Sequence, residues 1–317
     1  MAYTAGDPIL DDEYNNFVSS SSDPYGYNHF AGAGSGVYGL NQSSIATVSA
    51  GDTVAASSWN ALFTGLDNIA NHLNRSITSS SVSAGDTIAI RSALISDLAN
   101  LAADVAAGGA NVTALGTNAV GTSTNSATWN GTSTIERSVT FANNNTMRAF
   151  FNGGGKIRVD PSCVTGIDGS KDDVFNDLTV TAIGNLDIAA HATTRSGSGE
   201  TLTTNGLGNG FHDLGTGYTV LIKLTSDNSG YTSNTIEISA KLNAAIGSAT
   251  VITVKMVSVD AAADTTFQSG NLSSVPTNPN EAPKIVLALI ELSPNDTQGL
   301  AADIKSASNA EVSNSVS

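Results

Sequence analysis

The chain has 317 residues, a formal net charge of −15 and charged side chains at only 13% of its positions. Its first lysine is Lys156, so the N-terminal half has no basic stripe that could neutralise nucleic-acid phosphates or an anionic membrane. The single cysteine, Cys163, excludes an intramolecular disulfide framework. Because 40% of the residues are hydrophobic, the chain can form packed cores. We expect it to need no cofactor.

The N-terminal residues 1–13 have neither the basic segment nor the apolar segment of a signal peptide. The longest apolar run, 285–292, is interrupted by Glu291 and is too short to cross a bilayer. We therefore expect a soluble chain that is not exported by the signal-peptide route and does not bind a membrane.

A turn motif of the form Ala-Gly-Asp-x-aliphatic occurs three times, at residues 5–9, 50–54 and 84–88. Glycine permits a positive φ, and an aspartate beside it can accept backbone amide hydrogen bonds at the start of a following helix. The repeated aspartates are Asp7, Asp52 and Asp86. Three copies of a ligand site would share a larger set of polar residues, so we interpret these aspartates as turn and cap residues.

The first two turns are followed at the same offset by an aromatic residue and an asparagine, Tyr14-Asn15 and Trp59-Asn60, whereas the third has Ala93. From Trp59 to Leu73 the apolar residues recur with the spacing of one helix face. The segment 93–105 has the same spacing and is followed by two glycines. Residues 1–107 are therefore predicted to form a helical docking and oligomerisation region.

Residues 108–132 are mostly small or polar, with Trp129 as the one large anchor, and are predicted to be a linker or an extended surface segment. From 133 to 294 the pattern alternates, which predicts strands separated by turns rich in Gly, Asn and Asp. The predicted strands are 177–182, 218–225, 235–242, 249–259 and 285–292, the last in a central position. Residues 295–317 are predicted to be a polar tail that makes one helical turn and then frays. The predicted fold is α+β and multi-part, a helical region followed by an antiparallel β-sandwich of jelly-roll-like form.

One glycine-rich segment, residues 153–156, has a partial likeness to a phosphate-binding loop. Phe150 stands where the first glycine of such a loop belongs, and Ile157 stands where a Ser or Thr would bind magnesium. We therefore predict a hairpin turn between strands at 146–151 and 156–159.

The four histidines form no zinc-binding or protease spacing. They are His29, His72, His191 and His212. His72 is predicted to be solvated or at an interface, and a hydroxyl nucleophile assisted by His191 with Asp187, or by His212 with Asp213, lacks the Gly-x-Ser-x-Gly turn. We therefore predict no catalytic residue.

The segment Asp168–Asp173 has oxygen ligands at alternate positions, as a calcium loop does. A calcium loop would have glycine at the position of Asp173 and glutamate at the position of Thr179. We interpret the segment as a polar turn, with an ion site as the alternative, and predict no metal.

Two parts of the first half contain further aromatic and glycine residues in a recognisable order. The first part runs from Tyr14-Asn15 through the Tyr and Gly residues of 23–27 and 36–40 to the second Ala-Gly-Asp turn and Trp59. The second is 140–159, which contains Phe150-Phe151-Asn152-Gly153-Gly154 and Ile157-Arg158. Together the two parts resemble a family of virion structural proteins from tailed phages, especially cyanophages and other marine phages. In that family these positions hold a turn, a Tyr-Asn helix, a second turn before Trp-x-x-Leu and a Phe-Phe-Asn-x-Gly-Gly hairpin. Here the family's Gly-Tyr-Gly-Gln element is replaced by Val37-Tyr38-Gly39-Leu40.

The resemblance implies a non-enzymatic component of the tail, neck or fibre, found in the virion and assembled in the host cytoplasm. Its expected partners are copies of itself in a symmetric homo-oligomer and other virion proteins. Two alternatives stay open, a capsid decoration protein and an adhesin that binds host-surface glycans. The aromatic residues Tyr14, Trp59, Phe150 and Phe151 are interpreted as core anchors, with subunit contacts as the alternative.

Overall fold

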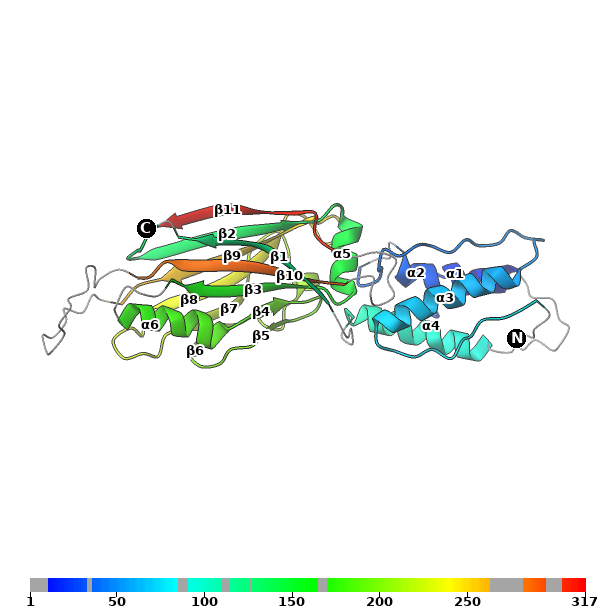
Figure 1. The fold of residues 1–317 in the computed structure, drawn as a ribbon, viewed down its shortest axis with the longest axis horizontal. Helices are drawn as coiled ribbons and strands as arrows, with labels where there is room; N and C mark the ends of the chain where they lie inside the picture. The colour runs from blue at the N-terminus through cyan, green and yellow to red at the C-terminus, as the bar shows by residue number, and fades with distance from the viewer. Residues whose placement is uncertain are drawn as a thin grey trace, which may run out of the picture. The chain divides into compact units, whose positions relative to one another are not determined.

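The computed structural model describes residues 11–32, 36–84, 91–109, 115–125, 127–164, 170–262, 282–294 and 304–317. The chain forms two compact units. Figure 1 labels their helices and strands. Unit 1 comprises Met1–Gly116, Asn143–Gly155 and Ser293–Lys305, and unit 2 comprises Thr117–Ala142, Lys156–Leu292 and Ser306–Ser317. The chain passes from one unit to the other after residues 116, 142, 155, 292 and 305, so five chain connections join them.

Unit 1 is helical. Its helices are α1 (Asp11–Ser19), α2 (Tyr27–Ala31), α3 (Ala56–His72), α4 (Arg91–Ala106) and α5 (Asn144–Asn152). The predicted faces of α3 and α4 are confirmed, since Trp59, Leu66, Leu98 and Leu101 are at most 2% exposed. Extended segments 41–49 and 75–83 connect the helices without joining a sheet.

Unit 2 contains two antiparallel sheets, and this confirms the predicted α+β fold with a β-sandwich. The five-stranded sheet has the order β1-β10-β3-β4-β5 and the six-stranded sheet the order β11-β2-β9-β8-β7-β6. The strands are β1 (Gly116–Thr124), β2 (Thr132–Thr140), β3 (Lys156–Cys163), β4 (Leu186–Ile188), β5 (Thr193–Arg195), β6 (Thr201–Asn205), β7 (Thr219–Thr225), β8 (Thr235–Leu242), β9 (Val251–Val259), β10 (Ile285–Ser293) and β11 (Ser308–Val316). β10 lies between β1 and β3, so its predicted central position is confirmed.

Alternation along the strands explains why the sheets have one buried face. In β8, Ile236, Ile238 and Ala240 on one face are fully buried, while Thr235 and Glu237 on the other face are half-buried and only Ser239 on that face is buried. The bulge between Val220 and Ile222 in β7 breaks this alternation locally. Four consecutive strands, β6 to β9, pair in sequence order, so most of the six-stranded sheet is a meander.

Two polar segments for which no sheet strand was predicted each contain one. The predicted linker 108–132 contains β1, and Trp129 is buried with its indole Nε1 donating to the carbonyl of Pro283 at 2.8 Å. The predicted frayed tail contains β11, which pairs with β2. Both are edge strands, and each hydrogen-bonds to one neighbouring strand. These backbone hydrogen bonds hold the two strands in place although they bury few apolar side chains.

The predicted hairpin before Lys156 is wrong, because its first arm is the helix α5. Asn143 caps that helix by accepting the amide of Thr146 at 2.9 Å. Met147, Phe150 and Phe151 are spaced three and four apart and are all buried, which is a helical pattern. The strand predicted at 177–182 is also wrong, because it lies in the π-helical segment η1 (Asp177–Ile183) that continues the helix α6 (Ser170–Asn176).

Unit 2 contains a buried ion pair between Lys171 on α6 and Asp260 after β9. The Nζ–Oδ2 distance is 2.6 Å, and the two side chains are 4% and 0% exposed. A charge at such a depth depends on its partner, because an unpaired buried charge is far costlier than a buried pair.

We expect Asp260→Asn to lower the free energy of unfolding by about 3–5 kcal/mol, because it strands the lysine charge. The double variant Lys171→Met with Asp260→Leu should recover a large part of that loss. Urea unfolding of both variants measures the difference. Equal losses in the single and double variants would contradict a role for charge pairing.

Candidate functional site

Three asparagines in unit 1 each hold an extended segment against a helix. Asn15 on α1 donates its Nδ2 to the carbonyl of Val48 and accepts the Val48 amide at Oδ1, both at 2.9 Å. Asn28 on α2 does the same with Ile45, at 2.8 Å in both directions. Asn60 on α3 does the same with Val82, at 2.9 and 2.8 Å. We call these three pairs the asparagine clamps.

Each clamp joins the interior to the extended segment. The residue before each asparagine is a buried aromatic, and Tyr14, Tyr27 and Trp59 are 1%, 4% and 2% exposed. The side chains of the clamped residues Ile45, Val48 and Val82 pack against the same hydrophobic core. Adjacent positions on a helix point about 100° apart, so the aromatic can enter the core while the asparagine reaches the segment beside it.

Helix α4 uses a carboxylate in place of an asparagine. Asp97, only 5% exposed, accepts the amides of Thr78 and Ser79 at 3.0 and 2.9 Å and the Ser79 hydroxyl at 2.7 Å. The segment 75–83 is therefore held from α3 by Asn60 and from α4 by Asp97. The third repeat has Ala93 and Leu94 where the other two have the aromatic residue and the asparagine, so it supplies no asparagine clamp.

Asp52 closes its turn but does not cap the helix that follows. Its Oδ2 accepts the amide of Ser49 at 3.2 Å, and Gly51 has a positive φ of 89°. The residue at the N-cap of α3 is Ala55, which makes no side-chain cap, so the predicted capping role of Asp52 is wrong. Asp7 and Asp86 lie outside the described residues.

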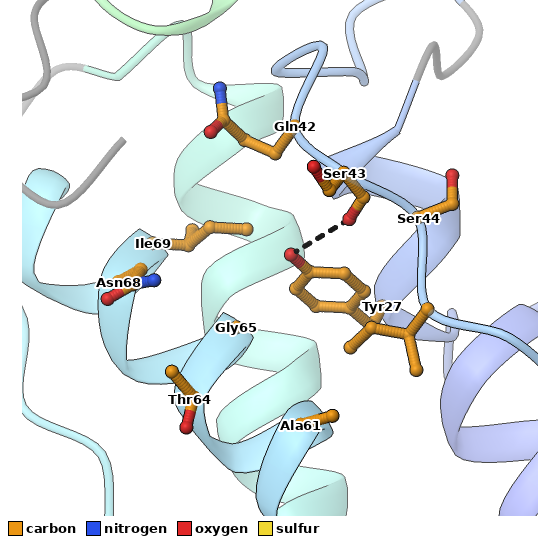
Figure 2. Close-up of a pocket in the computed structure, with 10 residues that line it drawn as sticks. Tyr27, Gln42, Ser43, Ser44, Ala61, Thr64, Gly65, Asn68 and Ile69 are labelled. Carbon is orange, nitrogen blue, oxygen red and sulfur yellow. Dashed lines mark hydrogen bonds between the residues drawn. The ribbon is translucent and has the colours of Figure 1, made fainter. Parts of the chain in front are cut away.

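A pocket of about 260 Å³ lies between α3 and the extended segment after α2 (Figure 2). Its lining residues are Tyr27, Gln42, Ser43, Ser44, Ile45, Ala61, Thr64, Gly65, Asn68 and Ile69. The Tyr27 hydroxyl donates to the Ser43 carbonyl at 3.5 Å, and burial raises the pKa of Tyr27 to about 12. The pocket therefore carries no charged group at neutral pH and can offer hydrogen bonds and apolar contact to a small neutral group.

Gly65 shapes this pocket because it admits the Tyr27 ring. A Cβ at Gly65 would stand 2.8 Å from the nearest ring carbon, which is far inside van der Waals contact. The ring therefore lies directly on α3, where it lines the pocket.

The four aromatic residues singled out from the sequence are all in the interior. Tyr14 and Trp59 contact one another edge to face, with ring centroids 5.2 Å apart, and the Tyr14 hydroxyl donates to the Ser58 carbonyl at 3.2 Å. Phe150 and Phe151 on α5 are fully buried and also pack edge to face, at 5.0 Å. Their burial supports the interpretation as core anchors.

The glycines after α5 do not form a phosphate cradle. The amides of Gly153, Gly154 and Gly155 donate to the carbonyls of Ala149, Phe151 and Phe150 at 2.8–3.0 Å. These donors close the C-terminal turn of a helix, whose free carbonyls repel anions. The three amides are therefore used within the fold.

The histidines and nearby carboxylates also have structural partners. Asp187 forms a two-point ion pair with Arg158, at 2.7 and 2.9 Å, and Asp213 accepts the Gly210 amide at 2.9 Å. His191 and His212 stack on one another with ring centroids 4.9 Å apart. Among the described residues, no group of three or more His, Cys, Asp and Glu side chains could hold a metal ion.

The predicted polar turn at Asp168–Asp173 is only partly described. Asp168 lies outside the described residues, and Ser170 to Asp173 belong to α6, so this part is helical. The side chain of Lys171 in this segment is committed to Asp260.

His72 is buried, contrary to the solvated or interface position expected for it. It lies at the end of α3 with 0% exposure, and its Nε2 contacts the carbonyl of Gly153 at 2.9 Å. Because a carbonyl can only accept, the Nε2 must carry the proton. Burial lowers the pKa of His72, and the Gly153 carbonyl only partly offsets this effect.

Comparisons with known proteins gave no relative. No family model matches the chain, and neither a curated protein nor a solved structure matches it. In the described ranges, no helix has both the length and the apolar character needed to cross a bilayer.

We expect Asn60→Ala to lower the free energy of unfolding by about 1–3 kcal/mol, because it leaves the Val82 amide and carbonyl without their partner. The matched control is Asn68→Ala, which removes an exposed asparagine from the same helix and should change stability by less than about 0.5 kcal/mol. Urea unfolding measures both. Equal small effects would show that the clamp contributes nothing.

We expect His72 to make unit 1 less stable as the pH falls below the ordinary histidine pKa of 6.5. The pKa of His72 is lower in the folded chain than in the unfolded chain, so the unfolded chain binds the proton first as the pH falls. The stability that neutral His72 contributes is therefore fully present above pH 6.5 and is lost as the pH falls toward the folded pKa. His72→Gln keeps a donor for Gly153 and does not titrate. The stability difference between the native chain and this variant should therefore shrink from pH 7.5 to pH 5.5 in thermal unfolding, and a constant difference would contradict the assignment.

Proposed function

We propose that this chain is a non-enzymatic structural component of a tailed-phage particle, associated with the tail, neck or fibre. It assembles as a symmetric homo-oligomer and contacts other virion proteins. The resemblance of its first half to phage virion proteins is the reason for naming this class of particle.

The observation that carries the proposal is the use of the polar side chains. The two carboxylates that the sequence offered for catalysis have partners within the fold, since Asp187 pairs with Arg158 and Asp213 accepts the amide of Gly210. The asparagine clamps likewise use polar groups to hold the chain in shape. Such use favours a structural role over an enzymatic one.

The chain connections give a second argument. Five chain connections join the two units, so a mechanical force between the units is shared among them. Unfolding one connection leaves the other four in place. A component that must remain intact in an assembled particle benefits from such redundancy. The same property would suit a capsid decoration protein, so the position in the particle needs a direct test.

The pocket is the feature that favours the second candidate, a glycan-binding adhesin. It is lined by hydroxyl and amide side chains and carries no charged group (Figure 2), and such uncharged polar groups can hydrogen-bond to a sugar. Unit 2 supports the adhesin less well, because the rings of Phe175 and Phe211 are fully buried and cannot stack on a sugar. The ring of Tyr218 contacts the ammonium groups of Lys241 and Lys255 at 4.3 and 3.9 Å from its centroid.

Quantitative mass spectrometry of purified particles tests the proposed function. We expect the chain in the particle at a low copy number that follows one cyclic symmetry. A copy number that matches the capsid lattice would favour the decoration protein, and absence from the particle would contradict both structural assignments.

A glycan array distinguishes the adhesin. The structural proposal expects no binding by the native chain. Binding that is lost in Thr64→Trp, which fills the pocket, and kept in Thr232→Trp, at an exposed position of unit 2, would establish the adhesin in its place.

A further inference from the structure

The six-stranded sheet ends on one side at β11, which hydrogen-bonds to β2 and forms the edge of the sheet (Figure 1). β11 has nine residues, of which Asn314 and Val316 are half-buried and the others exposed. The side chain of Val312 is 53% exposed. An edge strand presents a row of backbone donors and acceptors that another strand can pair with.

The register shows which groups face the open edge. Thr132 and Ser317 exchange two hydrogen bonds, each at 2.9 Å, and from there Val316 faces Ser133, Ser315 faces Thr134 and Asn314 faces Ile135. Hydrogen-bonded and non-hydrogen-bonded pairs alternate in an antiparallel ladder. The backbone of Ser315 therefore points toward β2, and the amides and carbonyls of Asn314 and Val316 point to the open edge.

From Ser313 to Val316 this edge lacks the charges, prolines and bulges that keep sheet edges apart. Residues 308–316 contain no lysine, arginine, proline or glycine. The edge strands at the other side are shorter, with five residues in β6 and three in β5, and Thr193 of β5 donates its amide to Leu207 just after β6. The irregularity in β11 lies between Glu311 and Ser313, so the ladder is regular from Ser313 onward.

The chemistry of the edge favours a second copy of the same chain as its partner. Antiparallel pairing about a two-fold axis lets the same strand serve both sides, and the hydroxyl and amide side chains of Ser and Asn can each donate and accept. The chain has a net charge of −15, so two copies repel unless they meet where charge is sparse. β11 carries a single charge, at Glu311.

We propose that β11 pairs antiparallel with β11 of a second copy, about a two-fold axis at Ser315, and joins the two six-stranded sheets into one. Asn314 of each copy then faces Val316 of the other in hydrogen-bonded pairs, and the two Ser315 residues face each other in a non-hydrogen-bonded pair. The two Glu311 residues stand about 27 Å apart at a rise of about 3.4 Å per residue, beyond the screening length of about 8 Å. The inference names the interface of the proposed homo-oligomer and rests on that part of the proposed function.

Cysteine cross-linking of the full chain tests the register. With Cys163 replaced by serine, Ser315→Cys should form a disulfide-linked dimer under mild oxidation, because facing residues of a strand pair lie within disulfide reach. The matched control is Ser308→Cys, also exposed on β11, whose two copies would be about 48 Å apart and should stay monomeric on a non-reducing gel. A dimer with Ser308→Cys and none with Ser315→Cys would overturn the interface, and so would equal cross-linking.

A proline variant tests the hydrogen bonds without breaking β11 from β2. Val316→Pro removes an amide that points to the open edge, and proline is tolerated at such edge positions. We expect at least a tenfold rise in the dimer dissociation constant by analytical ultracentrifugation, with an unchanged melting temperature. Unchanged dimerisation would overturn the proposal.

A loss of dimer together with a lower melting temperature would leave the Ser315→Cys result to decide. Native mass spectrometry separates this inference from the proposed function. An oligomer that forms while neither cysteine cross-links would overturn the β11 interface and keep the assembly role. A monomer at every concentration would contradict the homo-oligomer itself.

Discussion

Extended backbone that lies outside a sheet must still find partners for its amides and carbonyls, and in unit 1 this requirement is met by helix side chains. A carboxamide has N–H donors and a carbonyl acceptor in one plane, so it can offer the same donor and acceptor pair as a neighbouring strand. The clamps at Val48, Ile45 and Val82 therefore replace a sheet with three single side chains. The rest of unit 1 depends on them, since the clamped residues also bring apolar side chains to the core.

The clamps also explain how short helices make a stable unit without a disulfide. Helix α2 has five residues and could not persist alone. It is held because Asn28 clamps Ile45, while the amides of Leu40 and Gln42 donate to the carbonyls of Phe30 and Ala31 at 3.0 and 2.7 Å. The pocket beside α3 is a consequence, because the extended segment runs over Tyr27 at a position where Gly65 leaves room for the ring.

The helices and most central strands could be predicted because their apolar residues have a clear period. The edge strands β1 and β11 were missed because the signal of a strand is alternating burial, and an edge strand of Ser, Thr and Asn has little of it. In α5 the run of glycines drew the interpretation toward a hairpin, although Met147, Phe150 and Phe151 already had helical spacing. The β-sandwich was predicted, but its strand order was not, because pairing between distant strands leaves no local pattern.

One side of the asparagine clamps could be recognised in the sequence, and the other side could not. The aromatic-Asn pairs at 14–15 and 59–60 were recognised, but their partners lie 33 and 22 residues away and could not be assigned. The signal that could have found them is that Val48 and Val82 stand at the same place before an Ala-Gly-Asp turn, and that Tyr27-Asn28 is a further aromatic-Asn pair. Amide hydrogen exchange of the native chain tests the clamps most directly. The amides of Ile45, Val48 and Val82 should be protected far more strongly than that of the exposed Thr47 between two of them, and equal exchange rates would contradict the account.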